Sequence, residues 1–338
     1  MPADPTGPGT RPLACTYAGS EVLPLGGSPI ILVLVPRLRN RLKTPRGVIR
    51  ALRAVRARVL VATPRQLSLV YDGRGRVRLY HAGSGYIEPA VIFHWLREQG
   101  ARDILDILEQ AGFRLVNRVS AWRIGNNKAL QLAVFERHGI PHPWSLFTYG
   151  PSRQLRPLRL AGQRRFVIKP HNSGRGVGVV RAWGREGAVR AHRRRVARRQ
   201  GSLIQAYIET AGTPRRHYRV DVIGGRAVTG GIAYARGHPW ITNEARGGYF
   251  QFSPDLRGIP ETARRLAERA AAAVGADFTG VDIIEDQSGQ FYVLEANEGP
   301  MFEARTSRYL ARHLLRIARE AKRGREGGAR NASRLTLG

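Results

Sequence analysis

Short apolar runs alternate with helical patterns along residues 28–120, and this alternation limits the chain to a small set of folds. Strand patterns recur at 30–35, 58–62, 77–80, 90–93 and 113–117, with helical spacing at 46–58 and 101–111. Strands that are separated by helices are typical of parallel sheets. We therefore predict an α/β lobe over residues 28–120, preceded by a flexible leader at 1–27.

A second unit is predicted over residues 121–322, where the expected strands outnumber the expected helices. Its expected helices are 128–138, 186–200, 260–274 and 306–321, and its expected strands are 165–169, 179–183, 202–207, 218–223, 226–234, 279–284 and 291–296. Residues 323–338 read as a basic flexible tail.

The net charge of +31 favours an acidic partner or reflects a bias of composition. Four of the 56 basic residues are lysine, so 52 are arginine, and arginine occurs in helices, strands and loops alike. We favour bias, which weakens the case for nucleic acid. The single cysteine, Cys15, excludes an intrachain disulfide. No secretory signal and no apolar run of membrane-spanning length occur, so we expect a soluble cytoplasmic protein.

Two of the four lysines lie where nucleotide-binding chemistry is expected. Lys128 opens an amphipathic helix, and Lys169 ends a strand before the glycine-rich loop 171–178. Glycines let a backbone approach an anion closely, and an ammonium is a compact point charge that an arginine does not replace. Alone the loop is a weak signal, and a plain β-hairpin turn is the alternative.

A carboxylate-bearing hairpin is the strongest local signal. If Ser288-Gly289 form a two-residue turn, Asp282 lies opposite Glu295, residue 284 lies opposite 293, and Asn297 shares the face of Glu295. A three-residue loop would break this register. The residues between them, Leu294 among them, would form the apolar face.

Two carboxylates about 5 Å apart repel each other by about 3 kcal/mol at an effective dielectric constant near 20. An oxygen-seeking cation such as Mg²⁺, shared with substrate phosphates, would offset this repulsion. Pairing with nearby arginines is the alternative.

Five segments in this order resemble the ATP-grasp superfamily, and most closely its ribosomal-protein glutamate ligase (RimK-like) branch. They are Asn127-Lys128, Phe166–Pro170 with the glycine loop, Leu203–Ile208, Gly280–Ile284 and Leu294–Pro300. The resemblance covers about residues 86–322 and implies an ATP-grasp domain of two lobes over 121–322, with a hinge near 203–210. Residues 28–120 would be the pre-ATP-grasp α/β lobe.

The resemblance also implies roles for individual residues. Lys128 and Lys169 would contact the ATP phosphates, under a loop with Ser173, Gly174, Arg175, Gly176 and Gly178. The hinge residues Gln205, Ala206, Tyr207 and Ile208 would read adenine through their backbone. Arg219 and Arg246 would be catalytic, Asn243 would help to bind ATP, and Asp282, Glu295 and Asn297 would hold two Mg²⁺ ions, with Mn²⁺ as a substitute.

Three positions depart from the family pattern. Ala206 replaces the usual hinge glutamate, His217 stands where a ribose-binding aspartate is usual, and Ile241 stands where an arginine is common. These changes affect ribose contacts and the choice of acceptor.

The function that follows is an ATP- and Mg²⁺-dependent carboxylate–amine ligase, which forms an amide through an acyl phosphate and releases ADP and phosphate. Its expected partners are small-molecule or peptide carboxylates and amines, with acidic ones suited to the net charge; no membrane is expected, and homo-oligomerisation is left open. An ATP-grasp small-molecule kinase, or a spore-coat-type homologue, is the first alternative. A basic nucleic-acid-binding protein is the less favoured one.

Overall fold

The computed structural model describes residues 28–38, 42–73, 75–96, 99–174, 176–210, 212–236, 240, 242 and 246–335. The predicted leader, Cys15, Arg175, Ile241 and Asn243 lie outside the described residues. Contacts divide the chain into two units, one containing residues 65–88 and the other residues 28–64 and 89–338. The lobe boundaries expected from the sequence stay predictions.

The smaller unit holds a three-stranded antiparallel sheet. Its strands are β3 (Leu67–Tyr71), β4 (Val77–His81) and β5 (Gly85–Ile87), in that order. The short turn η1 (Pro64–Gln66) precedes it. Only β4 was expected as a strand; β3, which is as long as β4, and the three-residue β5 were missed.

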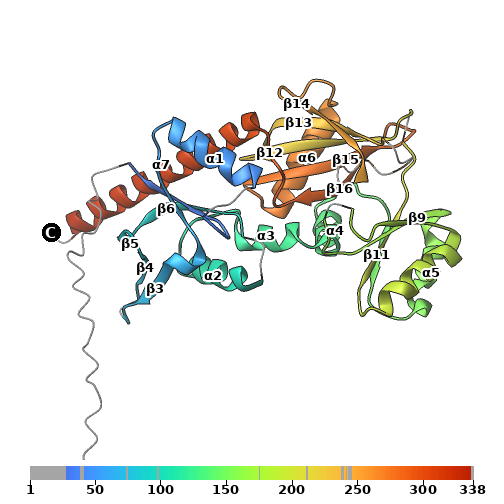
Figure 1. The fold of residues 1–338 in the computed structure, drawn as a ribbon, viewed down its shortest axis with the longest axis horizontal. Coiled ribbons are helices and arrows are strands. Elements are labelled where there is room, and N and C mark those ends of the chain that lie inside the picture. Colours follow the sequence, from blue (N-terminus) through green and yellow to red (C-terminus); the bar gives the residue numbers. More distant parts are fainter. Residues whose placement is uncertain are drawn as a thin grey trace, which may run out of the picture. The chain divides into compact units, whose positions relative to one another are not determined.

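The larger unit begins with a four-stranded parallel sheet (Figure 1). Its order is β2 (Arg58–Ala62), β1 (Ile30–Leu34), β6 (Pro89–His94) and β7 (Leu115–Val116). All residues of β1 and β6 are buried, as expected for strands covered on both faces. The α/β prediction is therefore confirmed, although the strand expected over 113–117 is reduced to two residues.

Helices complete this part of the unit. They are α1 (Lys43–Ala54), α2 (Gln99–Gln110), α3 (Val119–Gly125) and the long α7 (Ala304–Leu335). Helix α3 was not predicted. Helix α7 extends to Leu335 and so includes most of the residues 323–338 that were expected as a basic tail; the flexibility of this tail stays a prediction.

A second four-stranded sheet forms the small lobe of the larger unit. Its order is β10 (Val180–Trp183), β9 (Arg165–Lys169), β11 (Ser202–Ala206) and β8 (Ser145–Thr148), all antiparallel. Helix α5 (Gly184–Val196) and the 3₁₀ segment η2 (Ser152–Ala161) cover one of its faces. Helix α5 begins earlier and ends four residues earlier than predicted.

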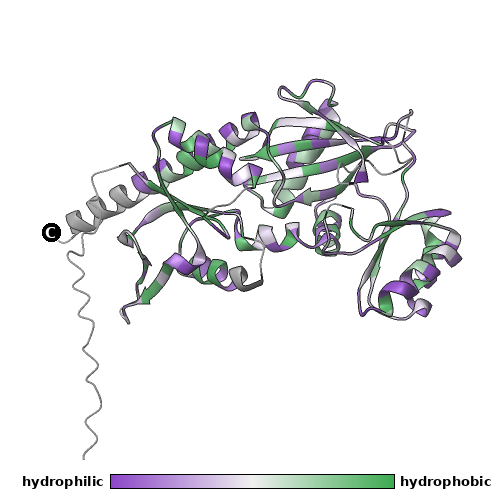
Figure 2. Ribbon diagram, viewed as in Figure 1, coloured by the Kyte–Doolittle hydropathy of each residue, from purple (hydrophilic) through white to green (hydrophobic). Residues whose placement is uncertain are grey.

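The third sheet of the larger unit has five antiparallel strands. Its order is β14 (Tyr249–Ser253), β13 (Arg226–Tyr234), β12 (Arg216–Ile223), β15 (Phe278–Glu285) and β16 (Phe291–Asn297). Helix α6 (Glu261–Val274) packs its alanine-rich face on one side of this sheet, and α4 (Lys128–Arg137) contacts the end of it. Apolar residues lie between this sheet and α6, and polar residues lie on the outer faces of the helices (Figure 2).

Among the described residues, no helix combines the length and apolar character that crossing a bilayer requires.

Candidate active site

The carboxylate hairpin is formed by β15 and β16, and Asp282 lies opposite Glu295 as predicted. The turn differs from the prediction. Backbone bonds between Asp286 and Gln290 leave the three residues 287–289 in the loop, where Gly289 has a φ of 83°. Ile283 then pairs with Val293, not 284 with 293, and a β-bulge restores the register before Asp282.

The bulge changes the position of Leu294. Instead of lying on the buried apolar face, Leu294 lines the same pocket as Glu295 and Asp282. A bulge re-aims one side chain without moving the paired residues beyond it, so the site gains an apolar contact from the strand that supplies a carboxylate.

The two carboxylates and Asn297 converge. The Asn297 amide donates to Glu295 Oε1 at 3.0 Å and lies 3.4 Å from Asp282 Oδ2. Arg219 on β12 donates through two nitrogens to Asp282, and His217 Nε2 lies 3.5 Å from the same carboxylate. Pairing of the carboxylates with nearby arginines, the alternative considered from the sequence, is therefore observed for Asp282.

Neighbouring basic side chains keep both acids ionised. Burial opposes ionisation of Asp282, but Arg219 and His217 hold the pKa of its carboxyl far below the usual value. Burial also opposes ionisation of Glu295, where Lys128 lowers the pKa against the repulsion from Asp282. The site thus presents two carboxylates at neutral pH.

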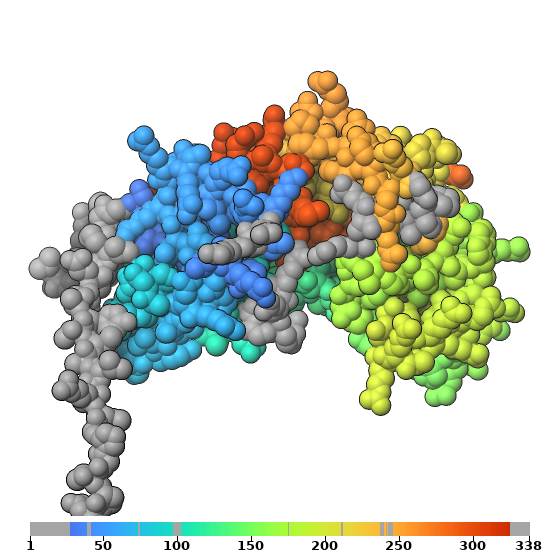
Figure 3. Space-filling model, viewed as in Figure 1, coloured from blue at the N-terminus to red at the C-terminus, as the bar shows by residue number. Residues whose placement is uncertain are grey.

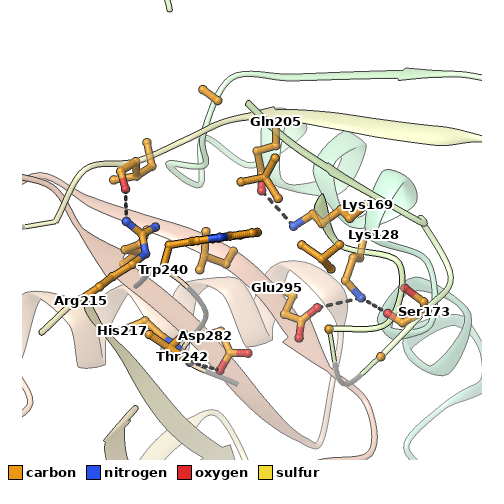
Figure 4. Close-up of a pocket in the computed structure, with 18 of the residues that line it drawn as sticks. Lys128, Lys169, Ser173, Gln205, Arg215, His217, Trp240, Thr242, Asp282 and Glu295 are labelled. Carbon is orange, nitrogen blue, oxygen red and sulfur yellow. Dashed lines mark hydrogen bonds and ion pairs between the residues drawn. The ribbon is translucent and has the colours of Figure 1, made fainter. Parts of the chain in front are cut away.

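Lys128 is placed by the start of α4. The Asn127 side chain caps this helix by accepting from the N–H groups of Ala129 and Leu130, both at 3.1 Å. The Lys128 ammonium lies 2.8 Å from Glu295 Oε2 and donates to the Ser173 carbonyl at 2.6 Å (Figure 4). It therefore joins the carboxylates to the glycine loop.

Lys169 ends β9 on the same side of the pocket. Its ammonium donates to Gln205 Oε1 at 2.9 Å, and Gln205 in turn donates to Ser145. Burial and the neighbouring Lys128 lower the pKa of Lys169 to about 8, against the attraction of Glu295 and Asp282. Gln205 thus holds the lysine with its side chain, a role that the sequence did not indicate.

The glycine loop joins β9 to β10, so the predicted strand–loop–strand order is confirmed. Ser173, Gly174 and Gly176 line the pocket, whereas Gly178 does not. Gly178 has a φ of 71°, and a side chain there would meet the ring of Pro170 at 3.0 Å. This glycine shapes the loop rather than contacting the pocket.

The predicted hinge residues differ in whether their side chains face the pocket. Ala206 and Ile208 line the pocket, while the Tyr207 ring packs beneath Arg215 at 4.3 Å. The N–H groups of Ala206 and Tyr207 donate to the carbonyls of Trp144 and Arg165. Among the described residues, the Ile208 N–H has no partner.

The two predicted catalytic arginines lie beside the pocket lining. Arg219 reaches the site through Asp282, and Arg246 donates to the Gly176 carbonyl of the glycine loop at 3.3 Å. The structure brings Arg219 into direct contact with the Asp282 carboxylate, and it places Arg246 on the loop. Arg175 and Asn243 lie outside the described residues.

Several lining residues were missed. They are Val167, Val179, Arg215, Arg216, Trp240, Thr242 and Ile284. Two of them follow from alternation, because Val167 shares a face with Lys169 and Ile284 shares a face with Asp282. Trp240 and Thr242 come from a loop whose approach no local pattern indicates, and Thr242 Oγ1 lies 2.7 Å from His217 Nδ1.

A four-stranded small lobe with a lysine and a glycine loop, facing a carboxylate hairpin, defines the ATP-grasp fold. Residues 125–316 match the family described as the RimK-like ATP-grasp domain, so the chain belongs to that family.

Two relatives illustrate the similarity in sequence. Over 201 residues, 56% of this chain, it is 31% identical to the tetrahydromethanopterin:alpha-L-glutamate ligase of Methanosarcina acetivorans. Over 240 residues, 71% of this chain, it is 28% identical to a probable alpha-L-glutamate ligase of Parasynechococcus marenigrum. The chain spans 59% and 49% of the lengths of these curated relatives.

Solved structures share the fold at low sequence identity. The ATP-grasp ligase PsnB, complexed with minimal precursor, Mg and ADP, has a TM-score of 0.65 at 20% identity and covers 86% of this chain and 97% of its own. D-alanyl-alanine synthetase A of Vibrio cholerae has a TM-score of 0.63 at 15% identity and covers 87% and 98%.

Proposed function

We propose that this protein is an ATP- and Mg²⁺-dependent carboxylate–amine ligase. The observation that carries the proposal is the convergence of Lys128, Lys169, Asp282 and Glu295 on one pocket with an apolar end. Such a pocket combines cations for a triphosphate with oxygen ligands for a metal. The names of the relatives, which are glutamate ligases, agree with it.

ATP would lie with its base at the apolar end of the pocket. Val167, Ile284 and Leu294 offer apolar contacts for the faces of adenine, and the Ile208 N–H, for which no described residue is an acceptor, offers a donor to a ring nitrogen. This backbone contact does not depend on the glutamate that Ala206 replaces. The triphosphate would then extend toward Lys128, Lys169 and the glycine loop.

The donor set fits magnesium. Asp282 and Glu295 supply carboxylate oxygens and Asn297 an amide oxygen, which are the hard ligands that Mg²⁺ prefers. These three residues would hold the metal, which when bound would neutralise phosphate charge. The number of ions, and use of Mn²⁺, are part of the proposal.

The reaction would proceed in two displacements. A substrate carboxylate oxygen attacks the γ-phosphorus, the bond to the β,γ-bridging oxygen breaks, and ADP leaves with that electron pair. An amine then attacks the carbonyl carbon of the acyl phosphate, phosphate leaves, and the nitrogen loses a proton. Arg219 and Arg246 would steady the transferred group through charge-assisted hydrogen bonds.

We propose glutamate as the first amine to test, because the relatives are named for it. The carboxylate partner would be a small molecule or a peptide; the ATP-grasp ligase PsnB was solved with a precursor peptide. ATP would be available in the cytoplasm, which is the location expected from the sequence.

The test is a substrate panel with magnesium and ATP, in which ADP release and amide formation are scored by mass spectrometry. We expect one ADP for each amide, and at least 100-fold slower turnover in the Asp282→Ala/Glu295→Ala variant. A matched Asp255→Ala/Glu261→Ala variant, changed at exposed acids outside the pocket, should keep wild-type turnover. AMP and pyrophosphate as products would contradict the proposal, and ADP without an amide would favour the kinase alternative.

A further inference from the structure

The small lobe carries a large share of the net positive charge. Residues 145–206 carry 15 arginine and lysine residues and a single acidic one, Glu186, a net charge of +14. The other 276 residues carry 41 basic and 24 acidic residues, a net charge of +17. The charge per residue in the small lobe is therefore several times the average of the rest of the chain, although residues 37–58 are denser still, with nine basic residues and no acidic one.

Most of this charge lies on the helical side of the lobe, in α5, its C-terminal turn and η2. We call this surface the arginine face. Its exposed members are Arg153, Arg156, Arg159, Arg185, Arg190, Arg193, Arg194, Arg198 and Arg199. Helix α5 is among the most hydrophilic segments in Figure 2, and Figure 3 shows the small lobe in green and yellow-green.

The arginines of η2 form a row with a regular repeat. Arg153, Arg156 and Arg159 are spaced three residues apart in a 3₁₀ helix, so they lie on one side at intervals of about 6 Å. Leu155 and Leu158 occupy the opposite, buried side.

A second row lies on α5. Arg190 and Arg194 are one turn apart, about 6 Å along the helix, and Arg198 follows in the turn beyond its C-terminus. Arg193 links the rows, because its Nε donates to Ser152 Oγ at the start of η2 at 3.3 Å.

These guanidinium groups are almost without acidic partners. Among the described residues, only Glu186 approaches the face, at 3.9 Å from Arg190. Crowded like charges destabilise the folded chain, and a bound polyanion would relieve that repulsion.

The arginine face is separate from the candidate active site. Phe166, Ile168 and Ile204 point from the sheet toward α5 and η2, whereas Val167, Lys169 and Gln205 line the pocket on the other side. An anion bound at the arginine face would not be the triphosphate.

We propose that the arginine face binds the phosphodiester backbone of nucleic acid. Each backbone phosphate offers oxygens in a geometry that a guanidinium fork contacts in pairs, and the phosphates repeat regularly whatever the base sequence. An acidic peptide would need an unbroken run of carboxylates to match two rows. The proposal does not depend on the ligase activity.

The experiment measures binding of the full-length protein to a fluorescein-labelled RNA of 20 nucleotides and to a DNA of the same length between 50 and 200 mM salt. We expect binding that weakens steeply with salt, with a log–log slope of about −4 if six phosphates are contacted. Arg156→Glu/Arg194→Glu/Arg198→Glu should weaken binding at least tenfold and make the slope shallower by about 2. Arg156→Lys/Arg194→Lys/Arg198→Lys should stay within about fivefold of wild type, because it keeps the charge.

The matched control is Arg46→Glu/Arg50→Glu/Arg53→Glu on α1, which alters the net charge equally at exposed arginines of another helix. It should weaken binding less than threefold. Circular dichroism melting checks the fold of each variant, and single Arg156→Glu and Arg198→Glu variants provide the salt slopes if the triple variant unfolds. Equal losses in both triple variants, no binding by wild type, or tighter binding of a 20-residue polyglutamate than of RNA would overturn the proposal.

Discussion

At the scale of single residues, two of the four lysines of this arginine-rich chain, Lys128 and Lys169, lie in the pocket. Lys128 donates to a loop carbonyl while it pairs with Glu295, and Lys169 is buried against Gln205. Both positions are confined, and a planar guanidinium would not fit the same contacts. The positions of these two lysines were found from sequence, but the burial of Lys169 was not.

The titration of Lys169 gives the first prediction. Its pKa of about 8 is below the value of a free lysine, chiefly because of burial, so the ammonium is charged below pH 8 and neutral above it. ATP affinity should be nearly constant from pH 6.5 to 7.5 and should fall up to about tenfold per pH unit above pH 8.

Calorimetric titration of ATP from pH 6.5 to 9.5 measures this dependence. Lys169→Arg should bind ATP more weakly throughout but lose the alkaline fall, because a guanidinium stays protonated. The same fall in both proteins would assign the titration to another group.

At the scale of secondary-structure elements, the start of α4 couples helix stability to the site. Asn127 caps two N–H groups of the helix whose first residue is Lys128. Asn127→Ala should lower the free energy of unfolding by about 1 kcal/mol and also weaken ATP binding, because the ammonium is no longer held at a fixed helix start.

Urea unfolding and ATP titration measure the two effects separately. Asn127→Ser is the matched control, since a serine hydroxyl also caps a helix and should restore most of both properties. Unchanged stability in Asn127→Ala would show that the cap does not hold this helix.

The register of the β15–β16 hairpin was predicted only in part from local patterns. Alternation placed Asp282 opposite Glu295 correctly, although the predicted turn was wrong, because the three-residue loop and the bulge shift the register in opposite directions. Neither deviation has a clear sequence signal of its own. The exposure of Leu294 to the pocket is the part that alternation could not supply.

Contacts between distant segments account for most of what was missed at the site. Trp240 and Arg215 line the pocket and lie near Tyr207, where ring and guanidinium contacts of 4.3–6.3 Å hold them together. These residues come from different elements and follow no periodic pattern. The ordered motifs therefore predicted the charged half of the pocket better than its apolar and aromatic half.

At the scale of the larger unit, α7 connects the parallel sheet to the sheet that carries the carboxylates. Leu310 and Leu314 are buried in the core formed with β1, β6 and α1. Near the start of the same helix, Thr306 Oγ1 lies 3.3 Å from Asp221 Oδ2 on β12, two residues from Arg219. A core substitution in the middle of α7 should therefore destabilise both sheets.

Leu314→Ala should lower the free energy of unfolding by about 2–5 kcal/mol, because it leaves a cavity in a fully buried layer. Removal of residues 323–338 should change the urea midpoint little, since among the described side chains the last apolar one packed on this core is Ala321. The two changes separate the packed part of the helix from its basic extension. If the truncated protein is as unstable as Leu314→Ala, the extension supports the fold, and the core as described is incomplete.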